Sequence, residues 1–178
     1  REFLATKAVV VRPTGRDVAD ADIHPSLFGF QRDMVRWAVR KGRAAVFADC
    51  GLGKTFIQLE WARMVGRRTL ILAPLSVARQ TAREATKIDL AVQYVRHGSD
   101  VTGDGIWITN YEMADGFDPA QFDAVVLDES SILKNVEGKT RQRLTTAFAS
   151  VPYRLACTAT PAPNDVAELC NHAEFLGV

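Results

Sequence analysis

The feature that most constrains the fold is a glycine-containing loop between an apolar run and an amphipathic segment. The run at residues 44–48 leads into the string DCGLGKT at 49–55, and a helical pattern covers residues 54–65. The spacing matches the phosphate-binding pattern G-x-x-x-x-G-K-[ST], except that Ala48 replaces the first glycine. We therefore predict a strand, a phosphate-binding loop and a helix. The competing interpretation is a simple glycine turn ahead of a helix.

Each residue type in this loop has a chemical reason to be there. Small residues let backbone N–H groups converge on phosphate oxygens, so Gly51, Leu52 and Gly53 are expected to surround ATP. The helix that starts near Lys54 directs its positive dipole end at the anion. Lys54 is expected to reach the β- and γ-phosphates, and the Thr55 hydroxyl to coordinate Mg²⁺.

Apolar runs alternate with helical patterns along the rest of the chain. The predicted strands are residues 44–48, 69–73, 92–95, 106–109, 124–127 and 153–157. One predicted helix begins near residue 30, and the others cover residues 54–65, 77–86, 139–149 and 165–175. Continuous apolar strands are typical of a parallel sheet covered on both faces. We predict an α/β fold with a mostly parallel sheet and ligands at the carboxyl ends of its strands. Residues 1–26 are predicted to hold a strand at 8–11 and a linker, and residues 27–178 to form one lobe.

Two adjacent acids end the fifth apolar run. Asp128 and Glu129 follow residues 124–127 directly. In a nucleotide-hydrolysing site the first acid holds the Mg²⁺ shell, and the second orients or deprotonates the attacking water. The alternative is an acidic strand end in solvent, which is common.

Composition and net charge narrow the classes of function that remain open. The chain has 178 residues, 47% of them hydrophobic, with a formal net charge of +1. It has no strongly basic field, so nucleic acid would have to be bound by local clusters, and no apolar run is long enough to cross a membrane. The scattered Cys50, Cys157 and Cys170 fit neither a zinc spacing nor a disulfide framework, which favours a cytoplasmic protein.

Six motifs in order resemble the superfamily 2 helicases and translocases, in particular the Snf2-like branch of the DEAD/DEAH-box proteins. They are FGFQRDMVRW, ADCGLGKT, LAPLSVARQ, ITNYE, LDESSILKN and CTATPAPN, followed by ELCNHAEFLGV. The forms DESS and TATPAPND are similar to those of phage and prophage helicase-like proteins. The resemblance covers residues 27 to 176 and implies the first RecA-like lobe of a bacterial or phage-encoded motor.

The resemblance also implies roles for individual residues. Gln31 would bind adenine, Lys54 and Thr55 would bind Mg-ATP, Asp128 would hold the metal, and Glu129 would activate water. Ser76, Thr109 and Asn110 would contact the nucleic-acid backbone. Thr158 and Thr160 would couple the nucleotide state to those contacts.

The sequence departs from the family pattern at Ser130-Ser131, where relatives have Ala-His; a coupling role for that histidine is therefore in doubt. The resemblance further implies a second RecA-like lobe that supplies arginine fingers. The chain alone is then expected to bind ATP weakly and hydrolyse it slowly. Duplex DNA is the preferred partner. The alternatives are a DEAD-type RNA helicase lobe and a nucleotide-binding interaction module without turnover.

Other side chains carry weaker expectations. Trp37, Trp61 and Trp107 lie in apolar patterns and are predicted to be core residues. His24, His97 and His172 do not cluster in the sequence and are predicted to be surface or capping residues. Phe28 and Phe30 flank Gln31 and are expected either to pack on adenine or to join the core.

Overall fold

The computed structural model describes residues 12–134, 139–162, 166 and 168–178. The predicted strand at residues 8–11 and the predicted start of the last helix at residue 165 lie outside these ranges. The described strands are β1 (Arg43–Phe47), β2 (Arg68–Ala73), β3 (Val92–Tyr94), β4 (Gly105–Asn110), β5 (Ala124–Asp128) and β6 (Tyr153–Thr158). All six coincide with predicted strands to within one residue at each end.

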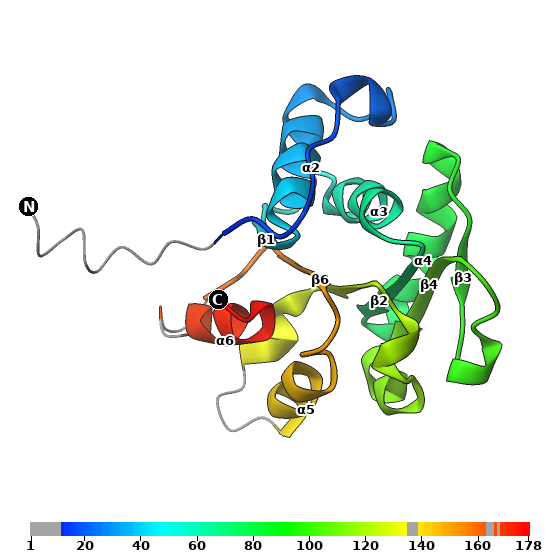
Figure 1. Cartoon of the computed structure of the whole chain (residues 1–178), viewed down its shortest axis with the longest axis vertical. Helices are drawn as coiled ribbons and strands as arrows, with labels where there is room; N and C mark the ends of the chain where they lie inside the picture. Colours follow the sequence, from blue (N-terminus) through cyan, green and yellow to red (C-terminus); the bar gives the residue numbers. More distant parts are fainter. Residues whose placement is uncertain (1–11, 135–138, 163–165, 167) are drawn as a thin grey trace, which may run out of the picture.

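The strands form one sheet in the order β1-β6-β5-β2-β4-β3, and every pair is parallel (Figure 1). The predicted α/β fold is therefore confirmed. Because all strands run the same way, the carboxyl ends of β1, β6 and β5 are neighbours at one edge of the sheet. The segments that follow β1 and β5 carry the two predicted phosphate and metal motifs, so the strand order brings these motifs together.

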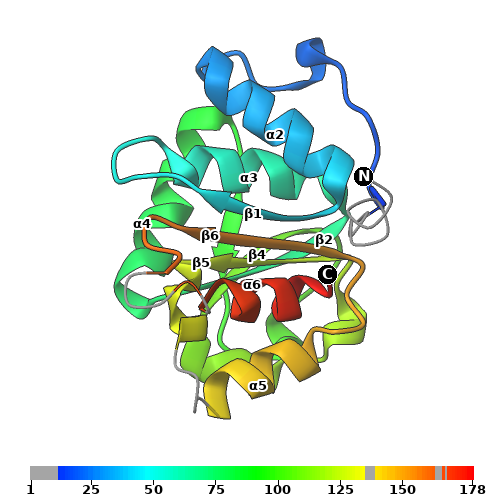
Figure 2. The ribbon, with the colours of Figure 1, turned by 90° about the vertical axis from the view of Figure 1, so that its left-hand side faces the viewer.

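Helices cover both faces of the sheet (Figure 2). The α-helices are α2 (Gly29–Lys41), α3 (Lys54–Val65), α4 (Leu75–Ala85), α5 (Lys139–Ala147) and α6 (Glu168–Leu176). The short 3₁₀ helices are η1 (Asp20–Asp22), η2 (Thr86–Ile88), η3 (Gly98–Asp100), η4 (Tyr111–Gly116), η5 (Pro119–Gln121) and η6 (Ser130–Lys134). Buried residues of α2, α3 and α4 pack on one face, and those of η4, η6, α5 and α6 pack on the other.

Alternate residues of each central strand enter the two cores. Val126 of β5 belongs to the core beneath α2, α3 and α4, whereas Val125 and Leu127 belong to the core on the α5 and α6 side. Successive side chains of a strand point to opposite faces. A strand that is covered on both faces must therefore be apolar throughout, which explains the uninterrupted runs in the sequence.

Part of the segment that precedes α2 packs against the lobe. Val18, Ile23 and Leu27 are buried in the first core, and the Thr14 and Gly15 amides donate to carbonyls at the end of α2. These contacts pack part of residues 12–26 against the lobe, whereas the predicted domain boundary at residue 26 stays a prediction. The polar and proline-rich composition of this segment suggested a linker, but the few apolar side chains reach the core.

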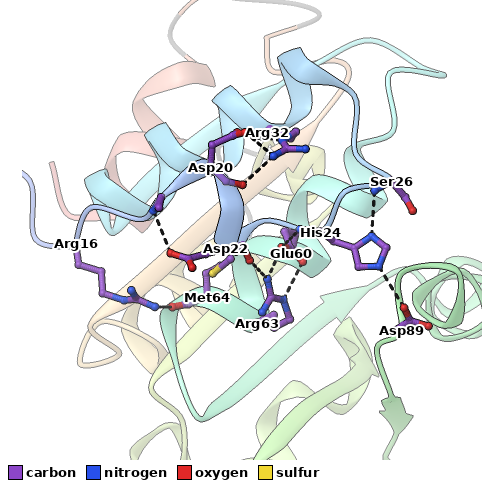
Figure 3. Close-up of polar contacts among 11 residues, drawn as sticks. Arg16, Asp20, Asp22, His24, Ser26, Arg32, Glu60, Arg63, Met64 and Asp89 are labelled. Atoms are coloured by element: carbon purple, nitrogen blue, oxygen red, sulfur yellow. Dashed lines mark hydrogen bonds and ion pairs between the residues drawn. The ribbon is translucent and has the colours of Figure 1, made fainter.

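Polar contacts hold the same segment against α2 and α3 (Figure 3). The Glu60 carboxylate is fully buried and accepts from the His24 amide at 2.8 Å and from Arg63 Nη2 at 2.6 Å. Arg32 Nε donates at 3.0 Å to Oδ1 of Asp20, the first residue of η1. A buried carboxylate with these partners ties the segment down, since losing either partner would leave a charge uncompensated.

The prediction for Trp37 is wrong, and one of the two alternatives for Phe28 and Phe30 is excluded. Trp61 and Trp107 are buried as predicted, but Trp37 is 47% exposed. The core face of α2 is formed by residues such as Val35 and Val39, and the helical period turns Trp37 away from it. Phe28 and Phe30 are also exposed and stack with their ring centroids 6.3 Å apart, which excludes the core alternative.

None of the helices in the described part of the chain is both long enough and apolar enough to cross a membrane.

Candidate active site

The candidate site lies at the carboxyl edge of β1, β6 and β5. Residue Phe47 of β1 is in register with Thr158 of β6, and Asp128 of β5 is in register with Cys157. The Ala48 amide then donates to the Thr158 carbonyl at 3.2 Å, which ties the start of the phosphate loop to β6. Strand β6 therefore lies between the two motifs and contributes Thr158 to the site.

The phosphate loop has the backbone that its glycines permit. Gly51 and Gly53 have φ angles of +82° and +74°, in the left-handed region that favours glycine. Helix α3 begins at Lys54, and Thr55 lies partly buried in its first turn. The free N–H groups of that turn and the helix dipole make this end of α3 suited to an anion.

The Lys54 side chain lies inside the loop. Its Nζ donates to the carbonyl oxygens of Ala48 at 2.8 Å and Asp49 at 3.2 Å. A phosphate in the loop would compete well for this ammonium, because a charged acceptor forms a stronger hydrogen bond than a neutral carbonyl.

Gln31 lies directly beneath the loop. Its Nε2 donates to the Leu52 carbonyl at 3.0 Å, and its Oε1 accepts from the Phe28 amide at 2.9 Å. The side chain is only 4% exposed. Both ends of the amide thus serve the protein itself, so in this structure Gln31 supports the loop; its predicted contact with adenine stays a prediction.

Asp128 is a buried carboxyl group at the end of β5. Its pKa is raised, chiefly because burial disfavours the charge. The charge of Glu129 adds to the rise, while Gln58, the Glu129 backbone and Lys54 oppose it. Its Oδ2 atom has no hydrogen-bond partner within the described residues. A hard cation such as Mg²⁺ takes carboxylate oxygens as ligands, so this oxygen fits the predicted metal position beside Lys54.

Glu129 has an unusual backbone conformation and a defined partner. Its φ of +57° lies in the left-handed region, which is uncommon for residues other than glycine. Its Oε1 accepts from the Thr158 hydroxyl at 2.7 Å, and Thr158 Oγ1 in turn accepts from the Thr160 amide at 3.1 Å. Both residues predicted to couple the nucleotide state are therefore joined by hydrogen bonds to the predicted base.

The three residues predicted to contact nucleic acid occupy different environments. Ser76 is exposed in a groove of about 580 Å³ on α4 that also contains Arg79 and Arg83. Thr109 is fully buried, so its hydroxyl cannot reach a ligand at the surface in this structure. Asn110 is almost buried, and its Oδ1 accepts from the Tyr94 hydroxyl at 3.2 Å.

Tyr111 and His172 are site residues that were not predicted. Tyr111, in η4, donates its buried hydroxyl to the Asp128 carbonyl at 2.8 Å. His172, in α6, is 2% exposed and lies 3.1 Å from Ser130 Oγ, which corrects its prediction as a surface or capping residue. Tyr111 lies within a recognised motif, but nothing in the sequence places a residue of the last helix against the acid pair.

Comparison with known proteins extends the sequence resemblance. No family model matches the chain. It is 31% identical to the SWI/SNF-related matrix-associated actin-dependent regulator of chromatin subfamily A-like protein 1 of Xenopus tropicalis over 169 residues. The Xenopus laevis protein of the same name is 30% identical. Each alignment covers 84% of this chain and 17% of the relative, so the chain spans a small part of these proteins.

Solved structures agree on the fold. The SWI2/SNF2 ATPase core of Sulfolobus solfataricus in complex with dsDNA has a TM-score of 0.75 at 21% identity, over 90% of this chain and 37% of that one. The UvsW helicase of bacteriophage T4 has a TM-score of 0.67 at 13% identity, over 98% of this chain and 64% of that one. The Pyrococcus furiosus Hef helicase domain has a TM-score of 0.65 at 16% identity, over 84% of this chain and 36% of that one. The chain therefore has the RecA-like α/β fold of a helicase lobe.

Proposed function

We propose that this chain is the ATP-binding first motor lobe of a Snf2-like translocase that acts on duplex DNA. One observation supports this most directly: the hydrogen-bonded series from Glu129 through Thr158 to Thr160 lies at the same sheet edge as the Lys54 loop. A plain glycine turn would have no need of the buried Asp128 and the adjacent Glu129 beside it. The sequence similarity to SWI/SNF-related proteins and the shared fold favour the Snf2 branch.

Nucleotide binding is assigned to the loop and the start of α3. The backbone of residues 51–53 and the ammonium of Lys54 would hold the phosphates. A Mg²⁺ ion held by Thr55 and Asp128 would neutralise negative charge on the phosphate oxygens. The unpartnered Asp128 Oδ2 supports this assignment, because a buried carboxylate oxygen otherwise has no compensation.

Hydrolysis is assigned to Glu129. Its carboxylate would orient the attacking water and accept its proton. The Thr158 hydroxyl, which donates to Oε1 at 2.7 Å, would fix the direction of that carboxylate. Thr160 would carry a change at Glu129 to the segment after β6, since its amide binds the same hydroxyl.

Duplex DNA is proposed as the track, held by phosphate contacts that position the protein without reading sequence. Ser76 lies in an exposed groove with Arg79 and Arg83, which are suited to phosphate oxygens. The solved SWI2/SNF2 core with dsDNA supports this choice over RNA. A second lobe would complete the site, and this lobe alone would turn over ATP slowly.

The test is ATP hydrolysis by the complete protein with no nucleic acid, with duplex DNA and with single-stranded RNA. We expect strong stimulation by duplex DNA and loss of hydrolysis in Glu129→Gln. Stimulation by RNA alone would favour an RNA helicase. Hydrolysis that is absent in the unmodified protein, while ATP still binds, would favour an interaction module, and unchanged hydrolysis in Glu129→Gln would refute the assignment of the base.

A further inference from the structure

A histidine from the last helix contacts both sides of the candidate site. His172 lies with Nε2 3.1 Å from Ser130 Oγ, and both residues are buried. Its ring also meets Phe47 edge-on, with centroids 5.3 Å apart. Phe47 ends β1 just before the phosphate loop, and Ser130 follows Glu129 directly. One side chain thus joins the segment before the phosphate loop to the turn that carries the predicted base.

The second contact of the ring favours one direction for this hydrogen bond. His172 Nδ1 lies 3.4 Å from the Glu168 carbonyl, which can only accept. A neutral ring that carries its proton on Nδ1 would donate to this carbonyl. Nε2 would then accept from the Ser130 hydroxyl.

The turn that Ser130 belongs to needs support. Glu129 has a φ of +57°, and such a conformation in a residue other than glycine is retained only where its surroundings enforce it. Tyr111 holds the residue before it through the Asp128 carbonyl at 2.8 Å. Thr158 holds the Glu129 carboxylate, and the Ser130–His172 bond holds the residue after it.

We propose that His172 is a positioning residue that fixes the Glu129 turn through Ser130 and so sets where the base meets water. This inference rests on the proposed function and adds a residue from α6 to it. Loss of the contact would let the turn relax, and small displacements of a catalytic group lower the rate strongly while leaving phosphate binding at the loop intact.

Steady-state ATPase measurements on the complete protein with duplex DNA test this. His172→Leu removes the acceptor, and we expect kcat to fall by about tenfold with the KM for ATP changed by less than about twofold. His172→Gln restores an acceptor oxygen and should recover most of kcat. Ser130→Ala removes the donor with little change in volume, and the double variant should be no slower than the slower single variant.

Phe175→Leu is the matched control. Phe175 lies on the same helix and is fully buried in the core on the α5 and α6 side, but its side chain has no polar atom that could hydrogen-bond to the Glu129 turn. We expect it to lower the melting temperature and leave kcat unchanged. Equal losses of kcat in His172→Leu and Phe175→Leu, or unchanged kcat in both His172→Leu and Ser130→Ala, would overturn the inference.

The result also separates this inference from the proposed function. Absence of hydrolysis in the unmodified protein would overturn both. Hydrolysis that depends on Glu129 but is unaffected by substitutions at Ser130 and His172 would overturn the inference alone.

Discussion

Two glycines of the phosphate loop allow its local architecture to be tested with one pair of substitutions. Gly51 and Gly53 both have left-handed backbones, with φ of +82° and +74°. A Cβ atom at Gly51 would meet nothing within 4 Å. A Cβ atom at Gly53 would lie 2.3 Å from Gln31 Nε2, the atom that donates to the Leu52 carbonyl. Alanine at either position therefore strains the backbone, but only alanine at Gly53 also collides with the Gln31 side chain.

The shared penalty is backbone strain. A left-handed residue that carries a Cβ costs roughly 1–2 kcal/mol, and restriction of the unfolded chain returns about 0.4–1 kcal/mol. We expect Gly51→Ala to lower the free energy of unfolding by about 1 kcal/mol. Gly53→Ala must also displace the buried Gln31 amide, and unpaired buried polar groups cost about 1–3 kcal/mol, so its total is about 2–4 kcal/mol.

Urea unfolding of the chain, followed by circular dichroism, measures both values. For a chain of this size about 1 kcal/mol corresponds to roughly 2–4 °C in melting temperature. Gln31→Ala supplies the decisive background, because it removes the atom that the new Cβ would strike. In the Gln31→Ala background, Gly53→Ala should lower the free energy of unfolding by no more than Gly51→Ala does. Equal losses for the two glycines in the natural background, or a Gly53→Ala loss that persists unchanged without Gln31, would refute this reasoning.

The remaining predictions concern the buried polar groups of the site. Thr158→Val should lower kcat of the complete protein about tenfold by freeing the Glu129 carboxylate. Thr109→Val should keep or raise stability in urea unfolding, since the Thr109 hydroxyl is buried with no hydrogen-bond partner among the described residues; marked destabilisation would contradict this. Asp128→Asn should stabilise the chain at pH 7 in a chelating buffer, because burial raises the Asp128 pKa and folding then opposes ionisation. The gain should shrink as the pH falls toward the usual aspartate pKa of about 3.9, and a gain that grows instead would reverse the sign of the argument.

Much of the fold could be read from the sequence because its signals are local. Every described strand coincides with an apolar run, and α3 spans the residues predicted for it. Two covered faces require strands that are apolar throughout, and the phosphate loop carries its own glycines at the positions with positive φ. The same locality explains the errors. The apolar residues around Trp37 predicted a core position, but its place on the helical period of α2 exposes it. The composition of the segment before α2 predicted a linker, although a few of its apolar side chains reach the core.

The arrangement of the site was decided only by tertiary structure. The sequence by itself determined that a phosphate loop and an acid pair each follow a strand. Their meeting depends on β6 lying between β1 and β5, which no local pattern encodes. The approach of His172 to Ser130 depends on how α6 packs across that edge. Such contacts join residues far apart in the chain, and their geometry is set by the packing of whole elements against one another.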